Sequence, residues 1–505
     1  MLNKRNVEVG LLAGASALAK FLPSERLKRA SKRYLHEKMS SLRGIPMKLN
    51  QILEMNETDL EGSEELIKKE VELPIEEIRS FLEHNSADFL RDVQSISEKG
   101  IGASLGQVHC VTLMNGRKVA LKVRYFDSEK NMQIDTSMLS LVTENFSSFK
   151  KGFDLDAYSK TLSKELDDEL DYKREAEMQK RFEECYAENE EIVIPKLYDS
   201  YSKDTHLVMS WEEGLDIYDF LAVATEKQKR QAGKLIATFV LKSLLEFGLI
   251  YPDMNFGNFA FRLNGDSVQL VVYDFGACRE CPLQTRGALL NLLHEVEQGK
   301  GVILPWLVTL GFEEEKLLPL KDNLLAFLDM LFEPFTSESR FKLKEWQRKE
   351  RAKHILGKNR MNFMLAAPAD FLSSMRCFQG MFAYFNKLTQ DCYLKPILDE
   401  ISIKTRDQWQ SQIPVMLKSG AAHFKMSNLL YVKIYEGTRQ KIALSLPRQS
   451  IEDVESLMDA QVLETLEKQE IDLQAIKEKV RKNGYRAMDV FDINVGEKRY
   501  HVYLD

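Results

Sequence analysis

The sequence predicts an α+β protein in which strand-rich stretches lie on both sides of a long helical region. Three observations support this prediction. Alternating apolar and polar runs flank the dipeptide Asn115-Gly116, a strong signal for a β-hairpin. The chain from Gly276 to about residue 425 has a mainly helical pattern, and residues 425–505 contain two further pairs of strand-like runs with helix-like runs between them.

Length and composition indicate a globular protein with several cores. A chain of 505 residues is too long for one core of ordinary size, so two to four domains are expected. The net charge of -7 gives no general argument for binding nucleic acid. Six scattered cysteines favour a reducing compartment. Cys278 and Cys281 form a single CxxC, which we interpret as two ordinary thiols rather than zinc ligands.

The first forty residues allow two interpretations. The apolar run GLLAGASALA has the size of a signal-peptide core, but we favour an N-terminal helix, and no run reaches the roughly 18–20 residues that span a bilayer. The following stretch would form a helix with a basic face, which suits either an anionic membrane surface or solvent. This face comprises Arg26, Lys28, Arg29, Lys32, Arg33 and Lys38.

The stretch from Tyr251 to Gly276 carries the strongest chemical signal. It reads YPDMNFGN, then a variable segment, then VVYDFG, so Asp253 and Asn258 lie five residues apart and Asp274 follows sixteen residues later. A protein-kinase catalytic loop and its DFG sequence offer an Asp, an Asn and a second Asp in this order. Such hard oxygen ligands suit Mg²⁺. Either signal alone could be a turn or a chance spacing, but together they favour phosphate–Mg²⁺ chemistry.

A loop of small residues and a lysine fit the same chemistry. The loop Gly100–Gly106 lies at the tip of the first strand pair, where a backbone can approach a phosphate. Lys122 lies in an apolar strand, VALK, where an unpaired charge costs free energy. We therefore expect it to bind nucleotide phosphates and a glutamate on a helix, the alternative being a lysine that extends from an edge strand into solvent. The strand that ends at Glu212, Glu213 and Gly214 would lead into a hinge between two lobes.

Three further segments give local predictions. Pro74 is expected to open a helix, and residues 226–250 form an amphipathic one. Basic residues gather at Arg340–Arg360 around Trp346. The last eighty residues predict two hairpins with helices at about 450–466 and 472–483 between them, which would form a small module for docking or regulation.

Taken together, these pieces resemble the UbiB (AarF-related) family of atypical kinases from about residue 40 to residue 400. The order of the motifs carries the match, because ASLGQVH ahead of a VALK lysine, with ELDYKREA downstream, is a specific combination. The motifs are KLNQ at 48–51, GASLGQVH at 102–109, VALK at 119–122, ELDYKREAE at 169–177, YPDMNFGN at 251–258 and DFG at 274–276.

The resemblance implies a two-lobed protein-kinase-like fold with a helical N-terminal extension and a small C-terminal α+β module. We expect the extension at 1–90, a kinase-like N-lobe with the family insert at 91–214, a helical C-lobe at 215–424 and the accessory α+β module at 425–505. The resemblance also implies ATP or ADP and Mg²⁺ as cofactors.

By similarity, Lys122 binds the nucleotide phosphates and pairs with Glu175, Asp253 is the catalytic-loop Asp, and Asn258 and Asp274 hold Mg²⁺. The nucleotide would also contact the small-residue loop and the hinge. These contacts are expected at Gly102, Ala103, Ser104, Gly106 and Glu212.

Two further signatures match a regulatory lid. Lys48 and Gln51 match the KxGQ motif, and Glu169 and Asp171 match the ExD motif. In the family, both motifs belong to an extension that folds over the active site and restricts protein substrates.

The chain departs from the family pattern at several positions. Asn50 replaces the glycine of KxGQ, and Ile101 and Gly102 dilute the alanine-rich loop. Both histidines of HxDxHxxN are replaced, by Tyr251 and Asn255. Because the metal and catalytic positions remain, the sequence predicts nucleotide and Mg²⁺ binding more strongly than turnover.

Two functions remain open on the sequence alone. The first is an atypical kinase or ATPase that acts on lipid or isoprenoid-quinone intermediates, in the cytoplasm and peripherally at a membrane surface. The second is a nucleotide-binding pseudokinase that serves as a regulator or scaffold. The retained set of Lys122, Glu175, Asp253, Asn258 and Asp274 favours the enzyme, whereas the lost histidines and the C-terminal module favour the regulator.

Overall fold

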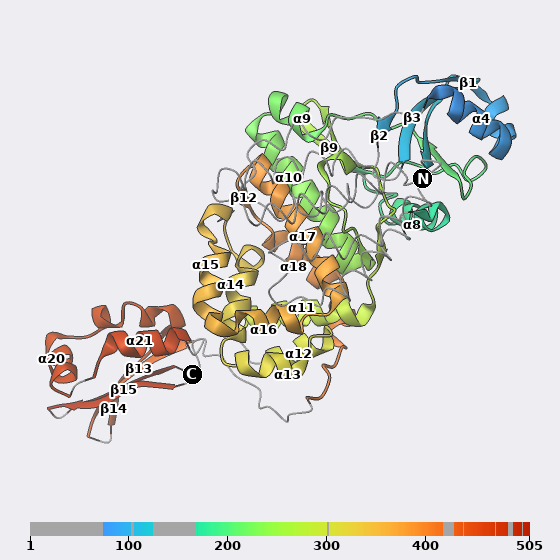
Figure 1. The fold of residues 1–505 in the computed structure, drawn as a ribbon. Coiled ribbons are helices and arrows are strands. Elements are labelled where there is room, and N and C mark those ends of the chain that lie inside the picture. Colours follow the sequence, from blue (N-terminus) through green and yellow to red (C-terminus); the bar gives the residue numbers. More distant parts are fainter. Residues whose placement is uncertain are drawn as a thin grey trace, which may run out of the picture. The chain divides into compact units, whose positions relative to one another are not determined.

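The computed structural model describes residues 74–102, 106–124, 168, 170–299, 302–417, 429–437, 439–469, 471–482, 488–496 and 498–504 (Figure 1). The chain forms two compact units. One comprises the chain up to Cys281 together with Leu372–Gln390, and the other comprises Pro282–Phe371 and the chain from Asp391 onward. None of the helices within these described ranges is long and apolar enough to cross a membrane.

The first unit opens with a five-stranded antiparallel sheet. Strands β3 (Gly106–Leu113) and β4 (Lys118–Arg124) form the hairpin predicted at Asn115-Gly116, where Gly116 has a φ of 79°. The strand order is β1-β3-β4-β6, and β2 pairs with β3. The remaining strands are β1 (Val93–Ile96), β2 (Ile101–Gly102) and β6 (His206–Ser210).

The two faces of this sheet have different neighbours. Helices α4 (Ile75–Asn85), which follows Pro74 as predicted, and α5 (Ala87–Arg91) pack on the face that includes Leu121. Ala120 faces the other way and packs with Tyr172 of α8 (Tyr172–Cys185). Because side chains alternate along a strand, Lys122 lies on the same face as Ala120, toward α8.

A second, three-stranded sheet follows in the same unit. The hairpin of β8 (Phe259–Asn264) and β9 (Ser267–Val272) pairs Phe259 with Val272, so the chain entering β8 and the chain leaving β9 meet at one end. Strand β5 (Ile192–Val193) pairs with β9. The remaining elements are α9 (Ile217–Val223), α10 (Glu226–Leu241), the π-helix η2 (Lys242–Phe247), β7 (Leu249–Ile250), η3 (Phe256–Asn258) and β10 (Arg279–Glu280).

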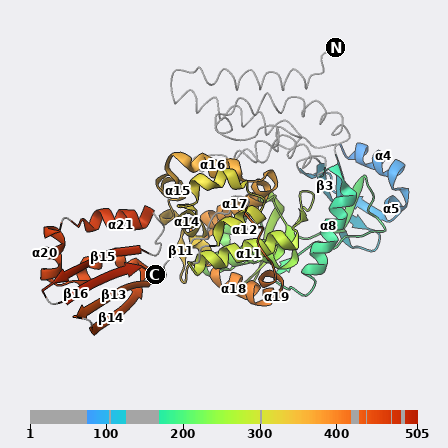
Figure 2. The ribbon, with the colours of Figure 1, turned by 90° about the horizontal axis from the view of Figure 1, so that it is seen from below.

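The second unit is largely helical up to residue 417 (Figure 2). Its principal helices are α11 (Leu283–Glu297), α12 (Ile303–Thr309), α14 (Leu324–Thr336), α15 (Arg348–Leu356), α16 (Arg360–Ala366) and α18 (Lys395–Lys404). Helix α17 (Ala369–Leu388) has its first residues in this unit and Leu372–Leu388 in the first. Shorter elements are α13 (Glu314–Leu317), η4 (Leu318–Leu320), β11 (Phe341–Lys342), η5 (Leu343–Glu345), η6 (Gly357–Asn359), β12 (Asp391–Cys392) and α19 (Arg406–Gln410).

The C-terminal residues form a four-stranded antiparallel sheet with helices on one face (Figures 1 and 2). Both predicted hairpins are present: β13 (Leu429–Glu436) pairs with β14 (Arg439–Pro447), and β15 (Met488–Val495) with β16 (Lys498–Leu504). Val462 of α20 (Ala460–Lys468) and Ile476 of α21 (Leu473–Lys482) pack on this sheet.

The predicted start of the first C-terminal helix, at about residue 450, is wrong by ten residues. Residues 448–457 instead contain two short 3-10 turns, η7 (Arg448–Ile451) and η8 (Val454–Leu457). Helix α20 begins after Asp459, whose carboxylate accepts a hydrogen bond from the Val462 amide at 3.0 Å. A side-chain cap of this kind fixes a helix start more strongly than an apolar period does.

Candidate active site

Three charged side chains from distant parts of the chain form a buried cluster. Lys122 Nζ lies 2.5 Å from Glu175 Oε1 and 3.2 Å from Asp274 Oδ1. The exposed fractions of the Lys122 and Glu175 side chains are 9% and 1%. They come from β4 and α8, and Asp274 follows β9. The lysine that the sequence predicts to need a partner therefore has two.

Burial and charge act in opposite directions within this cluster. Burial alone would lower the pKa of the Lys122 ammonium, but the carboxylates of Asp274 and Glu175 raise this pKa well above its ordinary value. For the Glu175 carboxyl, burial raises the pKa and outweighs the opposing effect of Lys122. The cluster thus holds a charged lysine at neutral pH.

The small-residue loop reaches the cluster through Gly106. A side chain there would place its Cβ 2.3 Å from the Val123 carbonyl oxygen and 3.0 Å from the Tyr172 hydroxyl, so only glycine fits. The Tyr172 ring lies 5.6 Å from Lys122 Nζ and 5.5 Å from the Arg124 guanidinium. Gly102 ends β2, while Ala103 and Ser104 lie outside the described residues.

Two polar residues of the GASLGQVH motif support the base of this loop. His109 Nδ1 lies 2.9 Å from the Ser97 carbonyl oxygen, to which it donates, and Gln107 Nε2 lies 2.7 Å from His109 Nε2. A Cβ at Gly100 would lie 2.7 Å from the same imidazole nitrogen. Both residues belong to the predicted motif, and both are buried in the fold, where they support the loop.

Asp253 and Asn258 lie together before β8. Asn258 Nδ2 donates to the main-chain oxygen of Asp253 at 3.0 Å, and the Tyr273 amide donates to the Asn258 main-chain oxygen at 3.0 Å. Because Asp274 directly follows Tyr273, this pairing places Asp274 next to Asn258. The amide nitrogen of Asn258 binds the loop, so its carboxamide oxygen is the atom that can serve as a metal ligand.

The two residues that replace the histidines of HxDxHxxN have different surroundings. Asn255 opens η3, and its carboxamide oxygen accepts from the Gly257 amide at 2.9 Å. Tyr251 is only 2% exposed, and its hydroxyl has no hydrogen-bond partner within the described chain. The Tyr251 ring packs against the rings of Phe182, Phe239, Phe259 and Phe275. Tyr251 is therefore part of an aromatic core behind the DFG phenylalanine, Phe275.

Arg174 is a site residue that sequence reasoning misses. Its Nη1 donates to the Gly276 carbonyl at 2.9 Å, and its Nη2 donates to the Cys278 carbonyl at 2.5 Å. The neighbouring Glu175 binds Lys122, so one turn of α8 holds both the β4 lysine and the chain after Asp274. The available signal was an arginine directly before the predicted glutamate.

The proposed lid residues are only partly within the structure. Asp171 caps α8, because its carboxylate accepts from the Arg174 amide at 3.0 Å. Lys48, Gln51 and Glu169 lie outside the described residues.

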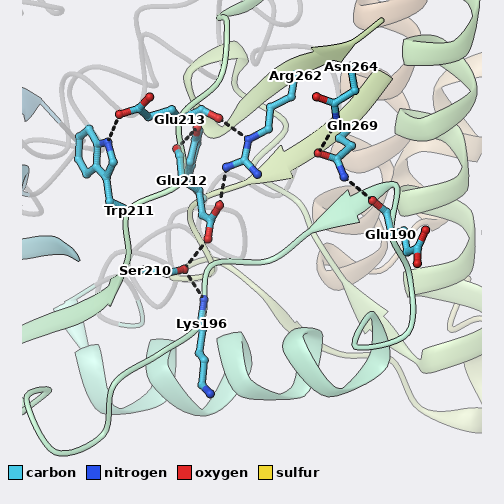
Figure 3. Close-up of polar contacts among 10 residues, drawn as sticks. Glu190, Lys196, Ser210, Trp211, Glu212, Glu213, Arg262, Asn264 and Gln269 are labelled. Atoms are coloured by element: carbon cyan, nitrogen blue, oxygen red, sulfur yellow. Dashed lines mark hydrogen bonds and ion pairs between the residues drawn. The ribbon is translucent and has the colours of Figure 1, made fainter. Parts of the chain in front are cut away.

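The hinge segment after β6 is held by polar contacts (Figure 3). The Glu212 carboxylate accepts from Ser210 Oγ at 2.7 Å and pairs with Arg262 of β8, whose Nε donates to the Glu213 carbonyl. The Tyr273 hydroxyl donates to the Glu212 carbonyl at 2.8 Å. Both carboxylate oxygens of Glu212 are engaged, so within the described chain this side chain holds the hinge segment together.

The donor set fits a metal that arrives with phosphate. Within the described ranges, no group of three or more His, Cys, Asp or Glu side chains could hold a metal ion. Asp274 and Asn258 offer one carboxylate and one amide oxygen, and Mg²⁺ commonly combines one or two carboxylates with phosphate oxygens and water. Cys278 and Cys281 are buried free thiols.

The chain is similar in sequence to several known proteins. Residues 65–300 match the family model described as ABC1 atypical kinase-like domain. Atypical kinase COQ8B, mitochondrial, of Danio rerio is 24% identical over 388 residues, which are 74% of this chain and 61% of the relative. Atypical kinase COQ8, mitochondrial, of Saccharomyces cerevisiae is 27% identical over 261 residues, which are 48% of this chain and 49% of the relative.

A solved structure shows the same fold. The complex of Rv3197 with erythromycin from Mycobacterium tuberculosis matches at a TM-score of 0.52 and 23% identity, covering 74% of this chain and 96% of that one. The predicted fold class, a protein-kinase-like α+β fold, is thus confirmed for the described residues. Residues 65–300, a little under half of the chain, match the ABC1 atypical kinase-like domain, and the resemblance of the motifs to the UbiB family is confirmed over this part. The chain spans about half to three fifths of the length of the two curated relatives described above.

Proposed function

We propose that this protein is an ATP-dependent atypical kinase or ATPase that binds Mg²⁺ together with a nucleotide and acts on lipid or isoprenoid-quinone intermediates at a membrane surface. One observation carries the proposal: Lys122 bridges Glu175 and Asp274, while Asn258 is bonded to the Asp253 main chain. The quinone part rests on the UbiB resemblance and on relatives that bear the COQ8 name.

The chain's own residues divide the work of nucleotide binding. Lys122 would donate to the phosphate oxygens, and Glu175 would keep its ammonium oriented. The loop between Gly102 and Gly106 would approach the phosphates, since Gly106 leaves room for the main chain. The hinge segment at Glu212, held by Ser210 and Arg262, would lie beside the base.

Asp274 and Asn258 would hold Mg²⁺, which supplies charge neutralisation at the phosphates when bound. Asp253 would accept the proton of the attacking hydroxyl or water. The same proposal includes a regulatory lid formed by Lys48, Gln51, Glu169 and Asp171. It also includes the division of the chain into an extension, an N-lobe, a C-lobe and an accessory module, at residues 1–90, 91–214, 215–424 and 425–505.

The proposal is tested by ATP hydrolysis in purified full-length protein, with and without anionic vesicles. Asp274→Asn and Lys122→Ala should each lower turnover by at least about a hundredfold, because each removes charge from the transferring phosphoryl group or its metal. Asp266→Asn makes the same chemical change in an exposed loop and should leave turnover unchanged.

If the wild-type protein binds Mg–ATP but hydrolyses it no faster than the Asp274→Asn variant, the proposed enzymatic activity is contradicted. That result would favour the nucleotide-binding regulator instead.

A further inference from the structure

The segment Arg340–Arg360 is strongly basic within an acidic protein. It holds nine Lys and Arg residues and two Glu, whereas the whole chain has 70 basic and 77 acidic residues. The segment runs from β11 through η5, α15 and η6 to the first residue of α16. Such a concentration of charge needs a physical explanation, because like charges close together destabilise a fold.

Three of the nine cations are explained by the fold itself. Arg340 pairs with Asp391 at 3.1 Å, Lys342 pairs with Glu345 at 3.0 Å, and Arg351 pairs with Glu333 of α14. These pairs tie the segment to β12, to itself and to α14.

The other six cations are exposed and form no ion pair within the described chain. Two of them, Lys349 and Lys353, lie four residues apart on α15, a spacing at which like charges repel each other. No ion pair within the described chain therefore explains the charges of Lys349 and Lys353. We call these six residues the basic surface: Lys344, Arg348, Lys349, Lys353, Lys358 and Arg360.

The support beneath the basic surface is fixed. Trp346 is 5% exposed, and its Nε1 donates to the Met330 carbonyl of α14 at 2.9 Å. The Arg348 guanidinium lies 5.5 Å from the centre of the Trp346 ring. Three of the six cations, Arg348, Lys349 and Lys353, lie on helix α15, which has nine residues and is about 13 Å long, and the other three lie in the elements directly before and after it.

An exposed apolar side chain lies beside these charges. Met364 is 39% exposed and follows Arg360 by four residues on α16, so both lie on one face of that helix. Trp346 and Phe363 are buried and cannot stack on bases, and the half-buried Phe341 packs edge-on against Trp346. Cations with an exposed apolar side chain fit the interface of a bilayer better than a nucleic acid.

We propose that the basic surface docks on an anionic lipid bilayer. This deepens the proposed function, because it names the surface by which the protein would reach lipid-soluble intermediates. Clusters of four to eight Lys and Arg residues are typical of binding to anionic lipids, and six lie here. The attraction is electrostatic, so it weakens as salt shortens the range of the charges.

The test is flotation of the full chain, without nucleotide, with vesicles of phosphatidylcholine alone or with about a third phosphatidylserine. The triple variant Lys349→Gln, Lys353→Gln, Lys358→Gln removes half of the basic surface. The matched control Arg79→Gln, Lys196→Gln, Lys234→Gln removes the same charge from exposed positions in the other unit, none of which forms an ion pair within the described chain.

Wild type and control should bind the anionic vesicles alike and ignore the neutral ones, and the triple variant should bind at least tenfold more weakly. Equal loss in the control, or no loss in the triple variant, overturns the proposal. So does binding of single-stranded RNA that depends on the basic surface while vesicles are not bound. Because nucleotide is absent from this assay, failure here leaves the proposed ATPase to be judged by its own experiment.

Discussion

Two groups of cations in this protein have opposite surroundings. Lys122 is buried and contacts two carboxylates, whereas the six cations of the basic surface are exposed and have no acidic partner within the described chain. A buried charge must be compensated inside the fold, since desolvation costs several kcal/mol. An exposed charge needs no partner, so a concentration of unpaired ones indicates something outside the chain. Burial with acidic contacts thus marks a residue of an internal site, whereas exposure without an acidic contact marks residues that can bind a partner outside the chain.

The largest expected effect comes from breaking the buried pair. Lys122→Met leaves Glu175 buried without its partner and should lower the free energy of unfolding by roughly 3–5 kcal/mol. The double variant Lys122→Met, Glu175→Leu should recover most of that loss, because it removes both charges of the pair and leaves no unpaired carboxylate at position 175. Urea denaturation measures both.

As a contrast, Lys349→Gln should change the free energy of unfolding by less than about 0.5 kcal/mol. A loss for Lys349→Gln as large as that for Lys122→Met would remove the distinction between the two groups.

The next effect concerns a buried histidine with no acid beside it. His206 is fully buried near the rings of Phe81 and Phe89, and burial lowers its pKa to about 4. Between pH 6.5 and 4 the unfolded chain binds a proton that the folded chain does not, so stability falls as pH falls, by about 3 kcal/mol in total.

Thermal unfolding as a function of pH measures this loss. His206→Gln should flatten the profile in that range, whereas His84→Gln, at an exposed position on α4, should leave it unchanged. An unaltered profile in His206→Gln would show that other groups cause the acid sensitivity.

A smaller effect is expected from loosening the chain after Asp274. Arg174→Met removes two hydrogen bonds to main-chain carbonyls, so Asp274 should be less well positioned and the Mg²⁺ concentration for half-maximal ATP hydrolysis should rise about tenfold. Arg174→Lys should restore part of the Mg²⁺ dependence, because an ammonium group can replace the two hydrogen bonds of the planar guanidinium only in part. If the Mg²⁺ dependence is unchanged while only stability falls, Arg174 has a purely structural role.

The smallest effect comes from a single hydroxyl. Tyr251→Phe should raise the free energy of unfolding by about 1 kcal/mol, because the buried hydroxyl has no partner within the described residues. Tyr186 is the matched control, since its hydroxyl contacts Ser243 Oγ at 2.8 Å and the Phe239 carbonyl at 3.1 Å. Tyr186→Phe should therefore destabilise by a similar amount. Loss of stability in both variants would show that Tyr251 has a partner after all.

Local patterns were sufficient to predict much of this structure. The turn at Asn115-Gly116 and the alternation in VALK predicted the hairpin and a lysine in need of a partner, and the motif order led to Glu175 and Asp274. The sequence did not reveal Arg174, because its carbonyl partners lie about a hundred residues away and depend on how α8 packs.

The same limit applies to the basic segment. Its charge was visible in the sequence, but only the fold separates the cations that pair with Asp391 and Glu333 from those that do not. The start of α20 was predicted wrongly for a local reason. The apolar periodicity placed it at about residue 450, whereas the side-chain cap at Asp459 sets it at Ala460.

Nucleotide binding with and without Mg²⁺, measured by calorimetry in wild type and Asp274→Asn, tests the central claim most directly. The account predicts that Mg²⁺ tightens ATP binding to wild type at least tenfold and gives no such gain in Asp274→Asn, while Lys122→Ala weakens binding under both conditions. Equal Mg²⁺ dependence in wild type and Asp274→Asn, or no nucleotide binding by wild type, would contradict it.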